Sequence, residues 1–253
     1  MNNIIFTTGY LKLSDQNFKS PKNYFIWFEK LCKTSINLVV YTNLENYNSI
    51  YNISIKYPNV LHIINIEIEE LQVYKWIKQY ENSENYKHIK LPEIRNLKKD
   101  TLNYFIMMNS KIDLIMKTYK LGQNDIIPLF KNYAWIDFGI FNVFQNEHIS
   151  SIKLNTLNTR IYPDKYIACP GCWNICTESI VNKINWRFCG GVIIINNLIL
   201  ETYHDIIMKY LENYIFNKGQ ITWEVNIWAD IEREIKLNFG WFSADHNDSI
   251  INF

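Results

Sequence analysis

The sequence predicts an α/β fold with a mixed, mostly parallel sheet flanked by helices. Short runs rich in β-branched and aromatic residues alternate with longer segments whose apolar residues recur at helical spacing. Parallel strands need a crossover connection, usually a helix, so this alternation favours a mostly parallel sheet. The length of 253 residues suits one core, and the chain shows no internal repeat or linker. We therefore expect a single domain over residues 1–253.

The first half of the chain alternates between predicted strands and helices. IIFTTGYL is an apolar run, whereas residues 23–35 place Phe25, Phe28 and Leu31 at helical spacing. The charged segment 68–100 predicts surface helices or a mobile excursion. The other predictions are strands at 4–11, 36–43 and 60–67, a helix at 23–35, a helix or irregular crossover at 44–57, and a helix at 102–120.

The second half predicts further strands and helices, and strand direction then predicts a binding edge. NYAWIDFGI (132–140) and FCGGVIIIN (188–196) predict buried strands, the latter opened by two glycines, and GWFSADHN (240–247) a short final strand. Helices are predicted at 198–216 and 223–235. Ligands of an open α/β sheet bind at the carboxyl ends of its strands. The side chains predicted on that rim are Thr7, Thr8, Tyr10, Tyr41, Thr42 and Asp137.

Composition argues against several classes of protein. The formal net charge is +1 and 20% of the residues are charged, so the chain lacks the basic character of a nucleic-acid binder. No run approaches ~20 apolar residues, which predicts no membrane span, and the first residues lack the pattern of a signal peptide. Five cysteines, an odd number, argue against a secreted disulfide framework. We expect a cytoplasmic protein, in the host cytoplasm if the source is a virus.

Asp137 is the first candidate for chemistry, because it interrupts the apolar run of a predicted core strand. A buried carboxylate is costly unless it is paired or binds a metal. It could cap a helix or pair with a lysine. Alternatively, Mg²⁺ or Mn²⁺, which prefer oxygen ligands, could bind there together with a substrate diphosphate. Gly139 would let another group approach the backbone closely.

Two further motifs carry residues that suit a ligand site. Gly190 and Gly191 form either a plain turn or a bare backbone edge against which a ligand lies. Glu224, near the start of a predicted helix, is either a capping carboxylate or a general base for a hydroxyl.

The remaining polar candidates lie near the C-terminus and on the helix at 102–120. His246, placed between Asp245 and Asp248, is either a structural residue or a metal ligand that the carboxylates orient. Asn103 and Lys111 could reach the rim of the sheet, where an ammonium would balance a diphosphate; alternatively, Lys111 extends along the helix to solvent.

Four of the cysteines follow the pattern CPGC-x3-C-x12-C, at Cys169, Cys172, Cys176 and Cys189. Four thiolates could hold a structural zinc ion. The second pair is not a CxxC, unlike that of a common zinc ribbon, so the spacing favours buried free thiols.

These motifs together resemble a known family. YAWIDFGI, the preceding helix that ends in NSK, and the later FCGG, TWEVN and ADHND resemble the HtrL/YibB family, whose members are assigned as glycosyltransferases. More widely, they resemble the GT-A superfamily of nucleotide-sugar-dependent glycosyltransferases, which has a Rossmann-like sheet. Four elements recur in that superfamily: an Asp-x-Asp metal motif, a glycine-rich loop, a carboxylate at the start of a late helix, and a C-terminal histidine. Their counterparts follow in the same order in this sequence.

The resemblance implies a role for each matching residue. Asp137 would hold Mn²⁺ or Mg²⁺ on the donor diphosphate, with His246 and Asp245 as further metal ligands. Glu224 would be a base in an inverting enzyme or an acceptor contact in a retaining one, so Glu224 and Asp137 are the predicted catalytic residues. The residues implied in nucleotide-sugar binding are Thr7, Thr8, Tyr10, Tyr41, Thr42, Asn103, Lys111, Trp135, Ile136, Gly139, Cys189, Gly190, Gly191 and Trp223.

One position departs from the family pattern. The Asp-x-Asp motif reads Asp137-Phe138-Gly139 here, so glycine replaces its second acidic residue. Water, the diphosphate or Asp245 would have to complete the coordination of the metal. A metal-independent enzyme is the alternative.

The resemblance implies a metal-dependent hexosyl- or N-acetylhexosaminyltransferase. It would move a sugar from a nucleotide sugar, expected to be UDP-linked, to a hydroxyl of a glycan or protein. Residues 1–145 would form the nucleotide-binding half and 146–253 the acceptor half. A catalytically inactive GT-A-like domain that binds glycans or partners, and a nucleotidyltransferase, are the alternatives. The oligomeric state stays open, with a homodimer as one candidate.

Overall fold

Seven strands form one sheet at the centre of the protein. They are β1 (Asn2–Tyr10), β2 (Leu38–Thr42), β3 (Val60–Asn65), β4 (Phe130–Ile136), β5 (Ile167–Gly171), β6 (Val192–Asn196) and β7 (Phe239–Ser243). Their order across the sheet is β3-β2-β1-β4-β6-β5-β7. β6 is antiparallel to its neighbours β4 and β5, and the other neighbouring pairs are parallel. The predicted mixed, mostly parallel sheet is therefore confirmed.

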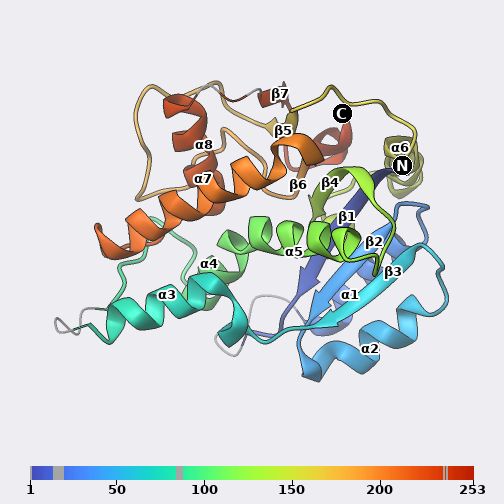
Figure 1. Cartoon of the computed structure of the whole chain (residues 1–253), viewed down its shortest axis with the longest axis horizontal. Coiled ribbons are helices and arrows are strands. Elements are labelled where there is room, and N and C mark those ends of the chain that lie inside the picture. Colours follow the sequence, from blue (N-terminus) through green and yellow to red (C-terminus); the bar gives the residue numbers. More distant parts are fainter. Residues whose placement is uncertain (1, 14–19, 84–87, 236, 238) are drawn as a thin grey trace.

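Helices cover both faces of this sheet in the computed structural model, which describes residues 2–13, 20–83, 88–235, 237 and 239–253 (Figure 1). The α-helices are α1 (Pro21–Cys32), α2 (Leu44–Ser54), α3 (Gln72–Glu81), α4 (Leu102–Asn109), α5 (Lys111–Gln123), α6 (Glu147–Leu157), α7 (Asn197–Phe216) and α8 (Glu224–Glu234). Three short 3-10 helices complete the described elements: η1 (Ile68–Glu70), η2 (Ile140–Asn142) and η3 (Asp248–Ile251).

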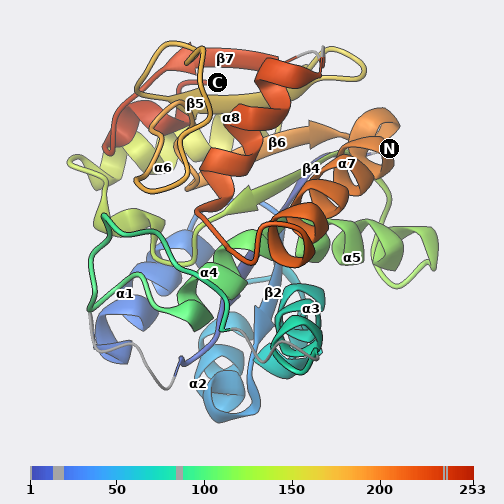
Figure 2. The ribbon, with the colours of Figure 1, turned by 90° about the vertical axis from the view of Figure 1, so that its left-hand side faces the viewer.

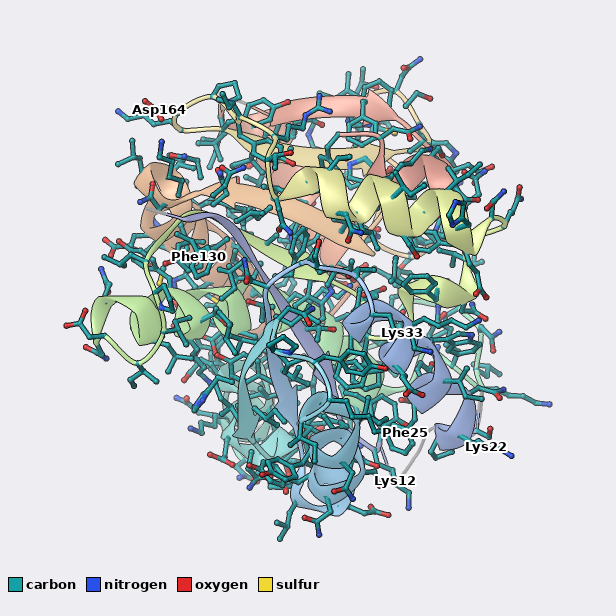
Figure 3. The ribbon with its side chains drawn as sticks, turned by 90° about the vertical axis from the view of Figure 1, so that its right-hand side faces the viewer. Lys12, Lys22, Phe25, Lys33, Phe130 and Asp164 are labelled. Carbon is teal, nitrogen blue, oxygen red and sulfur yellow. The ribbon has the colours of Figure 1, made fainter. Side chains whose placement is uncertain are left out.

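Strand side chains alternate between two apolar cores, one on each face, because successive residues of a strand point to opposite sides. Ile5 and Val39 belong to the core that α3, α4, α5, α7 and α8 cover. Phe6 and Val40 belong to the core under α1, α2 and α6. Figure 2 shows β5 and β7 at the opposite end of the molecule from α2. Figure 3 shows α1 and α6 on the side facing the viewer, with Lys22 and Lys33 near the two ends of α1.

The predicted helix at 102–120 is wrong in one respect, because the structure breaks it in two at Ser110. The Ser110 hydroxyl donates a hydrogen bond to the carbonyl of Ile106 at 2.8 Å, and the backbone N–H of Ser110 donates to the same carbonyl at 3.1 Å. A serine side chain that bonds to the helix backbone favours such a break. Lys111 consequently becomes the first residue of α5 rather than a residue in the middle of a helix.

One strand and one α-helix were missing from the prediction, as were the short helices η2 and η3. β5 has only five residues and contains Pro170, which argues against a strand in sequence-based reasoning. α6 has an N-cap, Asn146, whose side chain accepts a hydrogen bond from the N–H of Ile149, a local signal that was available. In the predicted excursion at 68–100 the structure has η1 and α3, and residues 84–87 lie outside the described residues.

The strand ends determine where polar side chains gather. β4 ends at Ile136, so Asp137 follows the strand instead of lying within it, and its N–H donates to the carbonyl of Gly191 at 2.9 Å. Since β6 is antiparallel to β4, the start of β6 meets the end of β4 at one edge.

None of the helices in the described part of the chain has the length and apolar character needed to cross a membrane.

Candidate active site

A cavity of about 270 Å³ opens at the edge where β1 and β4 end and β6 begins. This is where an open α/β sheet binds its ligands. Most of the predicted site residues line it: Tyr10, Lys111, Trp135, Asp137, Gly139, Cys189, Gly190, Gly191, Trp223, Glu224 and His246.

The predicted residues on β1 and β2 lie deeper in the sheet. Thr7, Thr8, Tyr41 and Thr42 are buried and do not line this cavity. The Thr7 hydroxyl donates to Thr118 Oγ1 at 2.9 Å, and the Thr42 hydroxyl donates to the carbonyl of Tyr10 at 2.9 Å. The lining also leaves out Asn103, Ile136 and Asp245. The binding roles of these seven residues stay predictions.

Lys111 lies at the centre of the polar part of the cavity, with its side chain only 2% exposed. Its Nζ donates to the carbonyl of Gly190 at 2.7 Å and to Glu224 Oε1 at 2.8 Å, and it lies 3.1 Å from Asp137 Oδ1. Three oxygen atoms thus match the three N–H groups of an ammonium. Burial alone would lower the pKa of Lys111, but the charges of Asp137 and Glu224 outweigh it and raise this pKa. Lys111 is therefore a fixed cation at neutral pH.

Asp137 is the most open of the three charged groups, with its side chain 40% exposed. Its Oδ1 atom accepts a hydrogen bond from Trp135 Nε1 at 2.6 Å, in addition to its contact with Lys111. Its Oδ2 atom faces Gly191, since a Cβ on that glycine would lie 3.6 Å away. One oxygen atom thus fixes the carboxylate, and the other is directed toward the bare backbone of the cavity.

Glu224 begins α8, and its carboxylate is pressed against the backbone of Gly190. A Cβ added to Gly190 would lie 2.3 Å from Glu224 Oε1, so any larger residue must displace the carboxylate. The same glycine supplies the carbonyl that binds Lys111. Steric crowding therefore requires glycine at position 190. At Gly191 the crowding is weaker, because an added Cβ would lie 3.3 Å from its nearest neighbour, Ile140.

The charges in this centre do not balance. Lys111 carries one formal positive charge against the two negative charges of Asp137 and Glu224, and it contacts both carboxylates. Lys99 also lines the cavity, so the excess of negative charge is confined to this group of three residues, where it attracts a cation. Oxygen ligands from a single carboxylate suit Mg²⁺ or Mn²⁺ when phosphate oxygens complete the coordination. The chemistry of Asp137 therefore fits a hard divalent cation that arrives with a diphosphate.

Gly139 packs closely against side chains of α1. A Cβ at Gly139 would lie 3.1 Å from two atoms of the Tyr24 ring and 3.3 Å from Trp27. Its backbone φ of −100° is open to any residue, so the constraint is steric. A larger side chain at this position would require the Tyr24 ring to move by a few tenths of an ångström, so packing against α1 disfavours a second acidic residue here.

Aromatic rings form the wall of the cavity on the side of β1. The ring of Tyr10 stacks on Phe138 with centroids 5.0 Å apart and lies 5.0 Å from Tyr24, which meets Trp27 edge-on. Burial, together with the charges of Tyr24 and Glu45, raises the pKa of Tyr10 to about 12, so its hydroxyl stays neutral. Such rings provide flat apolar surfaces for a sugar or a base.

Sequence reasoning missed several lining residues, including Tyr24, Trp27, Lys99, Tyr104 and Trp186. Tyr24 and Trp27 belong to α1, and Tyr104 belongs to α4, so each lies in a predicted helix. Nothing in a helical pattern tells which polar or aromatic position faces a cavity. Lys99 and Trp186 lie in irregular segments and carry no local signal at all.

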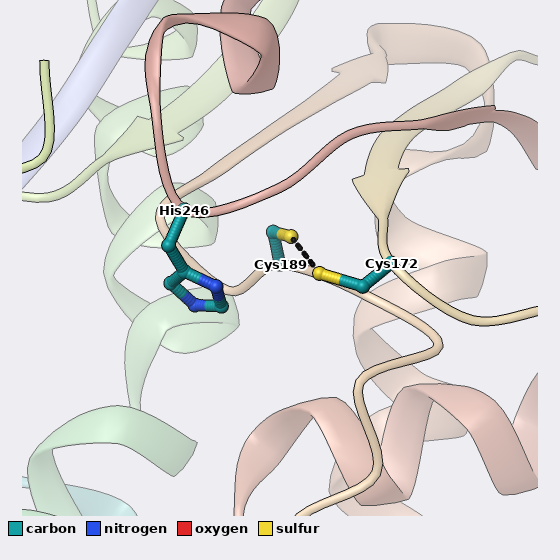
Figure 4. A group of neighbouring side chains, drawn as sticks. All are labelled: Cys172, Cys189 and His246. Atoms are coloured by element: carbon teal, nitrogen blue, oxygen red, sulfur yellow. Dashed lines mark hydrogen bonds between the residues drawn. The ribbon is translucent and has the colours of Figure 1, made fainter. Parts of the chain in front are cut away.

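His246 lies beside two thiols (Figure 4). Ligand atoms of Cys172, Cys189 and His246 all lie within 4.8 Å of one another, and the two sulfur atoms are 3.6 Å apart. Within the described residues, Asp137, Asp245 and His246 do not form such a group. Burial lowers the pKa of His246, so its imidazole is neutral at neutral pH.

The four-cysteine zinc site considered from spacing is not assembled as such. Cys176 Sγ contacts the carbonyl of Asn174 and the side chain of Asn185, each at 3.9 Å. Cys169 is buried, with its Sγ 4.0 Å from the carbonyl of Val192. The spacing between cysteines gave no sign that His246 would join two of them.

Comparison with known proteins leaves the family of the chain open. No protein-family model and no curated protein sequence matches the chain. Among solved structures, the apo form of mouse xyloside xylosyltransferase 1 matches with a TM-score of 0.48 and 7% identity, over 96% of this chain and 85% of that chain. The 4-diphosphocytidyl-2C-methyl-D-erythritol synthase of Anaerococcus prevotii matches with a TM-score of 0.44 and 10% identity, over 98% of this chain and 91% of that chain. Likenesses this low do not transfer an activity, and membership of the HtrL/YibB family stays a prediction.

Proposed function

We propose that this protein is a GT-A-like glycosyltransferase that moves a sugar from a UDP-linked donor to a hydroxyl of a glycan or protein. One observation carries the proposal: a buried ammonium, Lys111, joins Asp137 and Glu224 beside the bare backbone of Gly190. The group lies at the carboxyl edge of β1 and β4, where α/β sheets bind nucleotides.

The donor diphosphate is proposed to lie in the cavity, against the carboxylate of Asp137 and the bare backbone of Gly191. Asp137 would hold Mn²⁺ or Mg²⁺, and the phosphate oxygens would supply most of the other ligands. When bound, the cation supplies charge stabilisation for the departing nucleoside diphosphate. Lys111 adds a fixed positive charge 3.1 Å from Asp137 Oδ1, already oriented before the substrate arrives.

Glu224 is proposed to act on the acceptor or the transferred sugar. Its carboxylate lines the cavity at the start of α8, where it can accept a hydrogen bond from a sugar hydroxyl. Lys111 and Gly190 hold it in a single position. Tyr10, Tyr24 and Trp223 would provide flat walls for the base and the sugar rings.

The proposal is tested first by binding. UDP with Mn²⁺ should raise the melting temperature of the protein, because a ligand selective for the native state stabilises it. Asp137→Asn keeps the shape of the side chain but removes the charge, so Mn²⁺ should no longer strengthen UDP binding. Asp164→Asn is the matched control, since Asp164 is exposed and does not line the cavity. No shift with any nucleoside diphosphate, with or without metal, would contradict the proposal.

Turnover separates the proposal from its two alternatives. A glycosyltransferase hydrolyses its nucleotide-sugar donor slowly without acceptor, and Asp137→Asn should reduce this rate on the order of 100-fold or more. Release of pyrophosphate from a nucleoside triphosphate would instead identify a nucleotidyltransferase. Nucleotide or glycan binding without any turnover across UDP-, GDP- and CDP-sugars would identify an inactive binding domain.

A further inference from the structure

We propose that Cys172, Cys189 and His246 form a zinc-binding site in the wall of the cavity, separate from the cation proposed on Asp137. Two thiol groups and an imidazole present their ligand atoms within 4.8 Å of one another (Figure 4). Thiolate and imidazole ligands prefer zinc, whereas Mn²⁺ and Mg²⁺ prefer oxygen. The proposal does not depend on the transferase activity.

The spacing of the ligand atoms matches a tetrahedral ion. Two thiolates bound to zinc at about 2.3 Å in a tetrahedron lie about 3.8 Å apart. Cys172 Sγ and Cys189 Sγ are 3.6 Å apart in the protein, and each lies within 4.8 Å of a ring nitrogen of His246. An ion can therefore enter with side-chain movements alone.

Asp245 is the candidate for the fourth position, and it lies outside the group of three whose ligand atoms are all within 4.8 Å of one another. Its Oδ1 atom lies 3.9 Å from Cys172 Sγ and 3.7 Å from His246 Nδ1, close to the separations that neighbouring ligands of one zinc ion have. The Oδ1 atom also accepts a hydrogen bond from the N–H of His246 at 2.7 Å. Its side chain is 77% exposed, so we assign it the weakest ligand position.

The backbone brings the three ligands from three segments to one place. Cys172 directly follows β5, Cys189 directly precedes Gly190, and His246 follows β7. The N–H of Cys189 donates to the carbonyl of Pro170 at 2.7 Å, and the N–H of Ala244 donates to the carbonyl of Gly171 at 2.8 Å. These bonds hold the segments together before any ion binds, so the site is largely preformed.

A bound zinc ion would fix the loop on which the polar centre depends. Cys189 and His246 both line the cavity, and the carbonyl of Gly190, next to Cys189, accepts a hydrogen bond from Lys111. The long segment between β5 and β6 contains no helix or strand among its described residues, so a metal would replace the order that regular structure provides elsewhere. We assign the ion a structural role.

The experiment measures zinc directly on the full chain. The protein is purified with a thiol-free reductant, stripped with a chelator and titrated with zinc against a chromogenic competitor. The wild type should bind one equivalent, and Co²⁺ in its place should show thiolate charge-transfer absorption. Cys172→Ser, Cys189→Ser and His246→Asn should each weaken zinc binding by more than the ~10–100-fold that loss of an outer-shell partner costs. Asp245→Asn should weaken it less than these three.

Cys176→Ser is the matched control, because Cys176 lies in the same segment but outside the group, and it should bind zinc as the wild type does. In the wild type, zinc should also protect Cys172, which is partly exposed, from alkylation and leave Cys176 reactive, a readout that needs no variant to fold. The proposal is overturned if the reduced wild type binds no zinc, if Cys176→Ser loses as much affinity as Cys172→Ser, or if zinc fails to protect Cys172.

Discussion

Lys111 and Glu224 form a buried ion pair in which Nζ lies 2.8 Å from Oε1 and the side chains are 2% and 7% exposed. The pair joins the first residue of α5 to the first residue of α8, so two helix starts meet at the cavity. Burying two charges costs several kcal/mol per ion by itself, and their attraction offsets that cost only while both partners remain. The pair therefore makes each partner depend on the other.

Lys111→Met should destabilise the protein by about 3–5 kcal/mol, because it leaves Glu224 buried without its cation. Urea unfolding followed by circular dichroism measures the change. Adding Glu224→Gln to Lys111→Met should restore part of the loss, since the uncompensated charge is then gone. Lys56→Met is the control: Lys56 lies 3.7 Å from Glu29 with its side chain 59% exposed. It should cost less than about 1 kcal/mol. A Lys111→Met protein as stable as the wild type would show that the pair is not buried as described.

Gly190→Ala should destabilise the protein by about 1–3 kcal/mol, the usual cost of forcing extra atoms into a packed site. The new Cβ would lie 2.3 Å from Glu224 Oε1, which Lys111 holds in place. Gly191→Ala is the matched control, because its Cβ would be no closer than 3.3 Å to any neighbour. Unfolding of both variants, alone and combined with Lys111→Met, measures the coupling. Equal losses for the two alanines would contradict the steric role of Gly190.

The fold class was predictable because it depends on local periodicity, and one part of the site was predictable for the same reason. The apolar run before Asp137 implies that a strand carries this residue to the edge of the sheet, and the structure places it directly after β4. β5 was not predictable in this way, since Pro170 within five residues hides its strand character.

Contacts between distant segments could not be predicted. Lys111 was expected to face a diphosphate, but the structure engages it with Glu224, which lies 113 residues later in the chain. Likewise, Cys172 and Cys189 meet His246 only because β5 and β7 pair in parallel and end together. A sequence pattern records which face of an element a residue occupies and not which distant residue packs against it.

Stability should depend on pH through His204 and Asp113, which join α7 to α5. His204 Nε2 lies 3.5 Å from Asp113 Oδ1. Burial alone would lower the pKa of His204, but the contacts with Asp113 and Asp205 outweigh burial and raise this pKa. For Asp113, burial alone would raise the pKa, but the contacts with His204 and Lys117 outweigh burial and lower it. A histidine whose pKa is raised by folding stabilises the folded state at pH values below its ordinary pKa of 6.5. This stabilisation is lost as the pH rises through the pKa that the histidine has in the folded protein.

The pair should accordingly stabilise the fold when both groups are charged, above the lowered pKa of Asp113 and below the raised pKa of His204. His204→Gln should cost up to about 1 kcal/mol near pH 5.5 and less near pH 8.5. Urea unfolding at the two pH values measures the difference. His148→Gln is the control, since His148 is exposed, and it should cost less than about 0.5 kcal/mol. A larger loss for His204→Gln at the higher pH would reverse the sign and contradict the assignment.

Gly139→Asp should destabilise the protein by about 1–3 kcal/mol and should not by itself strengthen Mn²⁺ binding, because the new side chain crowds the packed Tyr24 ring. A Cβ at this position would lie 3.1 Å from the Tyr24 ring. Truncating that ring in Tyr24→Ala/Gly139→Asp should make room for the second carboxylate, and oxygen ligands in greater number bind Mn²⁺ more tightly. Metal titration in the presence of UDP compares the double variant with Tyr24→Ala alone, which controls for the loss of the ring. Tighter Mn²⁺ binding in Gly139→Asp than in the double variant would mean that the backbone, and not Tyr24, excludes the second acidic residue.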